Sequence, residues 1–133
     1  MTEVRNLNTT ALAFLGDSVY EVYVREKVLD SGETHADNLH RMAVKFVSAE
    51  GQAKAVKALM ESELTEEELS LVKRARNHKA SSSKRTKASK KGSDIITDKL
   101  ATAFEALIGW LYLNDRKERM EDLIGKAFEI IEQ

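Results

Sequence analysis

The segment Ala11-Leu12-Ala13-Phe14-Leu15-Gly16-Asp17-Ser18-Val19 carries a single charge in a run of otherwise uncharged residues. Asp17 is the only charged residue between Asn6 and Tyr20, and a second segment has the same character, with Glu105 as the only charge within residues 100–114. The apolar positions of both segments are typical of helices. An ionised carboxylate is costly to bury among apolar groups unless a cation, hydrogen bonds or a shifted pKa compensates it. The two acids are therefore candidates for a metal or acid/base site.

Composition restricts the kind of protein. The 133 residues, 42% hydrophobic and 32% charged, predict one helical, water-soluble domain that covers residues 1–133. No uncharged run approaches the roughly 20 apolar residues of a membrane span, and no basic segment leads into an apolar one at the N-terminus, so we expect a cytoplasmic location and no membrane partner. The absence of cysteine excludes disulfides and thiolate zinc sites, and the three histidines lack the spacing of a metal-binding pair.

Apolar residues recur at helical spacing along most of the chain, and no segment shows strand-like alternation. Proline is absent, so helix ends must depend on Gly, Ser, Thr, Asn and Asp; Thr65 followed by Glu68 is a capping-box pattern. We therefore predict an all-α fold of about six or seven helices. The expected helices run from Thr9 or Thr10 to Leu29, from 35–38 to 47, from 48 to 60, from 66 to 76, from Ile95 or Thr97 to Leu113, and from Lys117 to Ile131.

Positive charge is concentrated in residues 73–93, which hold nine basic residues and no acid, although the whole chain has a net charge of −1. Such a concentration favours contact with a polyanion. Residues 77–93 are rich in Ser and Lys and predict a mobile basic loop, because they offer too little apolar surface to order themselves. The segment has no aromatic residue, and this favours contact with the phosphates of a duplex over base stacking on a single strand. The alternative is a solvated loop that aids solubility.

Two carboxylates on packed helices would repel each other unless they shared a proton or bound a divalent cation. Mg²⁺ suits oxygen ligands and keeps several waters, one of which could attack a phosphodiester. The alternative is that both acids face solvent at helix edges. Gly16 and Gly109 lie beside these acids, and an interior glycine costs roughly 1 kcal/mol in a helix. Close approach of helices or subunits would explain them, as would simple tolerance of a small residue.

The first segment resembles the signature helix of ribonuclease III endonuclease domains, whose pattern is Leu-Glu-Phe-Leu-Gly-Asp-Ser. The segment Thr102-Ala103-Phe104-Glu105-Ala106-Leu107-Ile108-Gly109 resembles the Asp-x-Phe-Glu-Ala-Leu pattern of the same family. With the element Arg74-Ala75-Arg76-Asn77, and with no double-stranded RNA-binding domain following, the whole chain resembles the mini-ribonuclease III family, the stand-alone form of the domain. The resemblance implies an α-helical homodimer with a valley for duplex RNA, dependent on Mg²⁺. It also implies phosphodiester hydrolysis that leaves 5′-phosphate and 3′-hydroxyl ends.

Known members trim the stem at the ends of large-subunit (23S) ribosomal RNA precursor, so the resemblance implies the same role here. Whether a ribosomal protein assists is left open. Asp17 and Glu105 match two of the four family acids, as metal ligands and catalytic residues, whereas Ala13 and Thr102 stand where the other two acids occur. Either water holds the metal more extensively, or another acid contributes, for which Glu21 and Asp98 are candidates.

Two further sets of residues follow from the pattern. The expected RNA-binding residues are polar or basic and lie around the basic loop: Arg74, Arg76, Asn77, Lys79, Lys84, Arg85 and Lys87. The expected dimer interface uses the apolar signature helix: Leu12, Leu15, Gly16 and Val19. The departures at Ala13 and Thr102 favour the alternative of a catalytically inactive protein that binds structured or ribosomal RNA. A helical interaction protein without an RNA role is a third interpretation.

Overall fold

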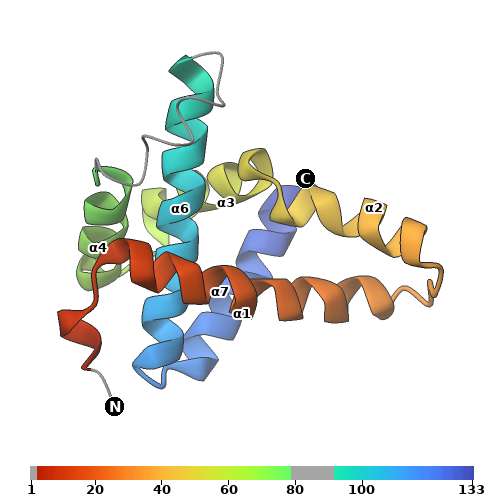
Figure 1. The fold of residues 1–133 in the computed structure, drawn as a ribbon, viewed down its shortest axis with the longest axis horizontal. Helices are drawn as coiled ribbons and strands as arrows, with labels where there is room; N and C mark the ends of the chain where they lie inside the picture. The colour runs from red at the N-terminus through yellow and green to blue at the C-terminus, as the bar shows by residue number, and fades with distance from the viewer. Residues whose placement is uncertain (1–2, 79–91) are drawn as a thin grey trace.

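Six α-helices and one short 3-10 helix make up the part of the chain that the structure describes, residues 3–78 and 92–133 of a computed structural model. Neither range contains a strand, so the predicted all-α class is confirmed. The elements are η1 (Val4–Asn6), α1 (Thr9–Leu29), α2 (Ala36–Val47), α3 (Ala49–Ser62), α4 (Glu66–Arg76), α6 (Gly92–Leu113) and α7 (Lys117–Glu132) (Figure 1).

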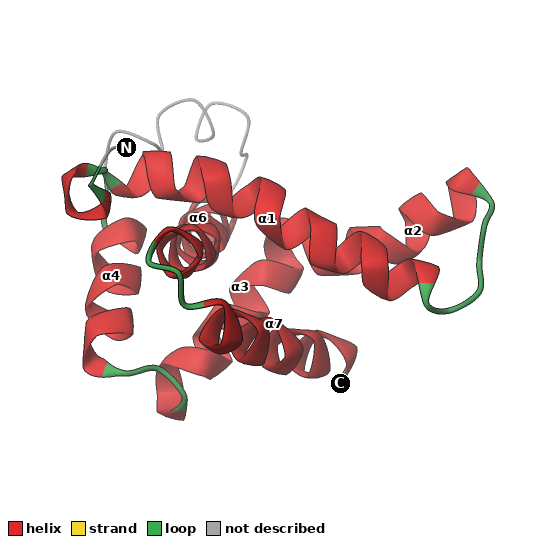
Figure 2. Cartoon of the chain, turned by 90° about the horizontal axis from the view of Figure 1, so that it is seen from below, coloured by secondary structure: helices red, strands yellow, loops and turns green. Residues whose placement is uncertain are grey.

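Helix α6 runs through the middle of the molecule, and α1, α3, α4 and α7 pack around it (Figures 1 and 2). It can take this central place because its second half is apolar on nearly every side: Phe104, Leu107 and Ile108 are fully buried, together with small alanines. Helix α2 packs on the C-terminal half of α1, and this pair of helices extends to one side of the molecule (Figure 2).

Helix boundaries follow local capping. The capping box of Thr65 and Glu68 is confirmed, and Ser48 caps α3 by accepting a hydrogen bond from the Gly51 amide at 3.1 Å. The predicted cap of α1 at Thr9 or Thr10 was wrong: Asn8 caps the helix, its side-chain oxygen accepting from the Ala11 amide at 2.8 Å. Helix α6 begins at Gly92, earlier than predicted, so the last two residues of the expected loop 77–93 are helical.

Side-chain hydrogen bonds join α1 to α2 and α7. The buried Tyr20 hydroxyl donates to the Phe46 carbonyl at 2.8 Å, and burial raises the pKa of Tyr20 above its ordinary value. The Tyr23 hydroxyl donates to Glu121 at 2.8 Å; burial, with this hydrogen bond, raises the pKa of Tyr23 to about 12. Among the described helices, none combines the length and hydrophobicity needed to cross a bilayer.

Candidate active site at the crossing of α1 and α6

The two segments that each carry one acid cross each other. Helix α1 passes over α6 at Gly16 and Gly109, and a Cβ atom on Gly16 would overlap the Glu105 carbonyl oxygen and lie 2.8 Å from the Gly109 amide nitrogen. A Cβ on Gly109 would overlap the Leu12 carbonyl oxygen and lie 3.1 Å from the Gly16 amide nitrogen. The helices therefore touch through their backbones, which explains both glycines as close-approach residues.

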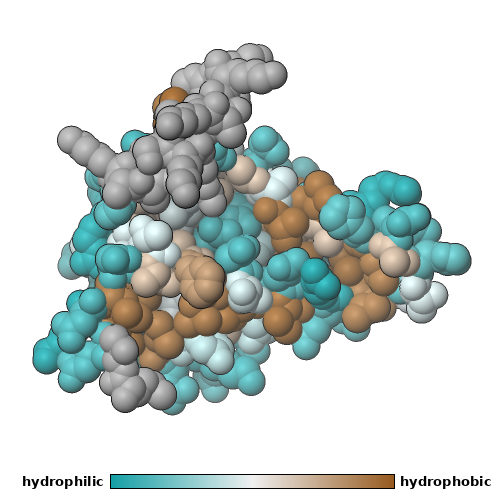
Figure 3. Space-filling model, in the orientation of Figure 1, coloured by the Kyte–Doolittle hydropathy of each residue, from teal (hydrophilic) through white to brown (hydrophobic). Residues whose placement is uncertain are grey.

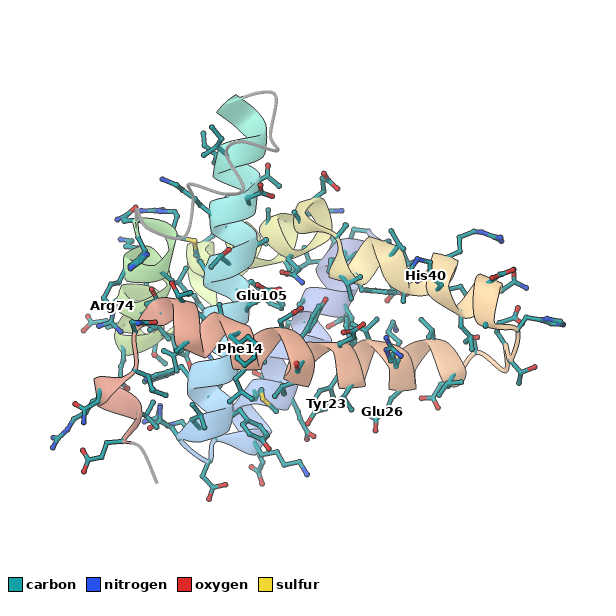
Figure 4. The ribbon with its side chains drawn as sticks, viewed as in Figure 1. Phe14, Tyr23, Glu26, His40, Arg74 and Glu105 are labelled. Carbon is teal, nitrogen blue, oxygen red and sulfur yellow. The ribbon has the colours of Figure 1, made fainter. Side chains whose placement is uncertain are left out.

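The crossing brings the two candidate acids onto adjoining backbone. Asp17 follows Gly16 directly and is exposed, while Glu105 is half-buried and its carbonyl is the group that Gly16 approaches. Figure 4 shows Glu105 on α6 beside the point where α1 passes in front of it. Two sequence segments that are 88 positions apart at these acids are thus in backbone contact, and the pairing of the two carboxylates stays a prediction.

Two buried aromatic side chains, one from each helix, pack against each other next to the crossing. The rings of Tyr20 and Phe104 meet edge to face at 4.9 Å, and both side chains are fully buried. Tyr20 lies three residues after Asp17, and Phe104 directly precedes Glu105. Because close-packed side chains in rotamer minima resist displacement, the backbone that carries both acids is held rigidly.

The other family positions carry no acid. Ala13 and Thr102 are 6% and 9% exposed, and no group of three or more His, Cys, Asp or Glu side chains that could hold a metal occurs within residues 3–78 and 92–133. Glu21 pairs with Arg25 at 2.9 Å and lines the cleft between α1 and α2. The structure therefore does not support Glu21 or Asp98 as members of a three-acid metal site.

Two carboxylates still fit Mg²⁺. This ion usually keeps several waters and takes only one or two protein carboxylates together with substrate phosphate oxygens. Asp17, which is exposed, and Glu105, which is half-buried, would be such a pair of carboxylates, with waters and a phosphate as the other ligands. Of the two hypotheses from the sequence, we therefore keep the one in which water replaces the missing acids.

The described RNA-binding candidates lie at the end of α4. Arg74 is exposed on the last turn, and the Arg76 Nε donates to the side-chain oxygen of Asn77, the C-cap residue, at 3.2 Å. Basic residues are favourable in a last helical turn, where carbonyl groups carry partial negative charge. Figure 4 shows Arg74 beside the N-terminal half of α1. The remaining candidates, Lys79, Lys84, Arg85 and Lys87, lie outside the described residues.

The predicted dimer residues divide into two groups. Leu12, at 1% exposure, and Gly16 are buried against α6 within the same chain, so their burial needs no second subunit; Leu15 and Val19 are half-buried. Phe14, which is 82% exposed, was not among the predicted interface residues. Figures 3 and 4 show hydrophobic surface along α1 and the Phe14 side chain on its outward side.

The sequence and the fold of the chain are similar to those of known proteins. Residues 10–116 match the family model described as the ribonuclease III domain. Among curated relatives, Mini-ribonuclease 3 of Enterococcus faecalis is 44% identical over 94% of this chain and 91% of its own length. Mini-ribonuclease 3 of Streptococcus pneumoniae is 38% identical over 99% of both chains. A crystal structure of a Fusobacterium nucleatum protein superposes with a TM-score of 0.79 at 28% identity, covering 97% of this chain and 98% of that one.

Proposed function

The chain belongs to the ribonuclease III domain family, and we propose that it is a Mg²⁺-dependent endoribonuclease that cleaves double-stranded RNA in the cytoplasm. The observation that supports the proposal is the backbone contact of α1 with α6 at Gly16, which directly precedes the exposed Asp17 and approaches the carbonyl of the half-buried Glu105. The relatives named Mini-ribonuclease 3 match nearly the whole chain, and this supports the same class of reaction here.

The chain's own residues have three tasks in the proposed reaction. Asp17 and Glu105 would hold the Mg²⁺ ion, with waters and a phosphate oxygen as its remaining ligands. A bound Mg²⁺ ion lowers the pKa of a coordinated water and polarises the phosphodiester. Arg74 and Arg76 would neutralise backbone phosphates and hold the duplex against the two acids. In the proposed hydrolysis the water oxygen would bond to phosphorus, the P–O3′ bond would break and O3′ would take up a proton, which leaves 5′-phosphate and 3′-hydroxyl ends.

The direct test uses the purified chain and one sequence in three forms: duplex RNA, single-stranded RNA and duplex DNA. We expect cutting of duplex RNA with Mg²⁺ and none after chelation. The absence of acidic residues at positions 13 and 102, which are Ala13 and Thr102 here, favours a second candidate, a catalytically inactive protein that binds structured RNA. Retained binding of the duplex without any Mg²⁺-dependent cutting would establish that second candidate instead.

We further propose that the natural substrate is the paired stem at the ends of 23S ribosomal RNA precursor. The support is the similarity to the mini-ribonuclease relatives across the chain. A transcript that contains both flanks should be cut within the stem, whereas a transcript with unpaired flanks should not. A ribosomal protein is a candidate further partner, which the same assay tests when proteins extracted from large subunits are added.

RNA binding is expected to be weak and strongly dependent on salt, because the candidate contacts are cationic side chains that neutralise backbone phosphates. If the six candidate cations each neutralise one phosphate, affinity should fall by about 10³-fold between 50 and 200 mM salt. Replacing Arg74 and Arg76 by glutamine should lower the slope of log K against log salt by about two. Arg41→Gln, at an exposed site on α2, is the matched control and should leave the slope unchanged. A binding constant that does not change with salt would refute phosphate contact.

We propose a homodimer that forms through the outward face of α1. The support is the exposure of Phe14 at 82% and Val22 at 55%, because burying one such side chain is worth about 1.5–3 kcal/mol. Phe14→Ser should shift the protein from dimer to monomer at micromolar concentration in sedimentation velocity. Ile96→Ser removes another exposed apolar side chain, on the N-terminal part of α6, and should leave the dimer intact. A wild-type protein that is monomeric at this concentration would contradict the proposal.

A further inference from the structure

The glycines at the crossing of α1 and α6 leave no room for a side chain. The atoms that a Cβ would meet at Gly16 and Gly109 are backbone atoms of the opposite helix, so no side-chain rearrangement can relieve the overlap. Helix axes usually lie about 8–10 Å apart, at a distance set by the side chains at the contact. Any larger residue at either glycine must therefore move the two helices apart.

Moving α1 and α6 apart at the two glycines would also move the backbone of both acids. Asp17 is bonded to Gly16, and Glu105 contributes the carbonyl oxygen that Gly16 approaches, one helical turn before Gly109. Mg²⁺ demands nearly ideal octahedral geometry with ligand distances of about 2.0–2.1 Å. Within residues 3–78 and 92–133, no third His, Cys, Asp or Glu joins the pair to compensate for a lost ligand.

We propose that the reciprocal contact of Gly16 with Gly109 sets the separation between the Asp17 and Glu105 carboxylates. The two glycines are thus positioning residues for the divalent cation. This inference rests on the function proposed above. It goes beyond that function, because it makes the affinity for the divalent cation depend on the distance between the α1 and α6 backbones as well as on the two ligands.

Two other glycines of this chain separate a positional effect from a merely steric one. A Cβ on Gly51 would overlap the Lys45 carbonyl oxygen, so this glycine is as crowded as the two at the crossing, but it lies where α3 begins. A Cβ on Gly125, in α7, would meet nothing within 4 Å. Alanine at Gly51 should disturb packing without moving the acids, and alanine at Gly125 should do neither.

The test measures Mn²⁺ binding by electron paramagnetic resonance, thermal unfolding, and duplex cleavage as a function of Mg²⁺ concentration. Gly16→Ala and Gly109→Ala should weaken Mn²⁺ binding by about 10- to 100-fold, the range seen when groups that orient a ligand are lost. Both variants should lower kcat and leave the KM for RNA unchanged. Gly51→Ala should lower the melting temperature but keep wild-type Mn²⁺ affinity, and Gly125→Ala should resemble the wild type.

A compensating substitution tests distance itself. Asp17→Glu lengthens one carboxylate arm by a methylene, so it should weaken Mn²⁺ binding in the wild type but strengthen it in the Gly109→Ala background. Folded Gly16→Ala and Gly109→Ala variants that bind Mn²⁺ as the wild type does would overturn the inference. So would an Asp17→Glu change that weakens binding equally in both backgrounds.

If neither alanine variant folds, as judged by circular dichroism, Glu105→Asp takes their place. It shortens the other arm by one methylene at an unaltered crossing, so unchanged Mn²⁺ affinity would refute the inference. Failure of the underlying function gives a different result, because a wild-type protein that neither binds Mn²⁺ nor cleaves duplex RNA overturns both proposals. A wild-type protein that cleaves, with glycine variants that retain its cation affinity, overturns only the positional inference.

Discussion

Replacing Asp17 by asparagine is expected to lower duplex RNA cleavage by about 10³-fold, because removal of a metal ligand forfeits roughly 4 kcal/mol of transition-state stabilisation. Asparagine preserves the size of the side chain and removes its charge. Asp17 is exposed, so the change buries nothing and the free energy of unfolding should stay within about 0.5 kcal/mol of the wild type. The measurement is single-turnover cleavage at saturating protein, combined with the dissociation constant for the same duplex in Ca²⁺.

The control for this variant is Asp30→Asn, which removes an exposed acid at the far end of the same helix. It should cleave at the wild-type rate. Duplex binding by Asp17→Asn should equal or exceed that of the wild type, because one negative charge near the RNA phosphates is lost. Wild-type cleavage by Asp17→Asn would place the active site elsewhere. A parallel loss of binding and cleavage would instead make Asp17 a structural residue.

Most of the fold could be predicted from local pattern. Helices α3, α4 and α7 each have one apolar face, so spacing and caps identify them within a few residues. The candidate acids could be identified by the same means, since Asp17 and Glu105 interrupt long uncharged segments. The contact between their helices required the structure, because no spacing rule states which faces of two distant helices meet.

The face of α1 that meets α6 could not be derived from composition. The helix is apolar on two sides: Leu12, Gly16 and Tyr20 lie inward, while Phe14 and Val22 lie outward. A residue such as Leu12 is therefore equally consistent with the core and with a subunit interface until the position of α6 is known. The helical phase of Phe14, two residues from Leu12, was the available signal that these side chains face opposite ways.

The ion pair between Glu68 and Arg119 could not be predicted from the sequence, although the local role of Glu68 could. Glu68 was identified as a capping-box residue of α4, and it is also the partner of Arg119 on α7, 51 positions away. The Arg119 Nε and Nη2 donate to the two Glu68 carboxylate oxygens at 2.9 and 2.8 Å, and Nη2 also donates to the Glu63 carbonyl at 2.7 Å. This bidentate pair holds α4, the helix that presents Arg74 and Arg76, against α7.

Replacing Arg119 by methionine is expected to destabilise the fold by about 3 kcal/mol, because Glu68 is 1% exposed and would keep an uncompensated buried charge. For a chain of this size that corresponds to a fall in melting temperature of roughly 10 °C. Denaturant unfolding monitored by circular dichroism measures the change. Lys126→Met is the matched control: it removes ion pairs with Glu63 and Asp122 whose side chains are about 40% exposed or more, and should cost less than about 1 kcal/mol.

The pH dependence of unfolding distinguishes a charge effect from a packing effect at this pair. Burial alone would raise the pKa of Glu68, but hydrogen bonds from Arg119 and from the Thr65 backbone outweigh it and hold the pKa below its ordinary value of 4.5. The unfolded chain therefore binds the proton first as pH falls, so the contribution of the pair is complete above 4.5 and is lost as pH drops through the folded-state pKa. In Arg119→Met the burial effect on the Glu68 pKa remains without the hydrogen bonds from Arg119, so acidification should cost this variant less stability than the wild type.

Adding Glu68→Gln to Arg119→Met should recover part of the lost stability at neutral pH, because it removes the unpaired charge. An Arg119→Met variant with the stability and acid sensitivity of the wild type would show that the pair contributes nothing to the attachment of α4.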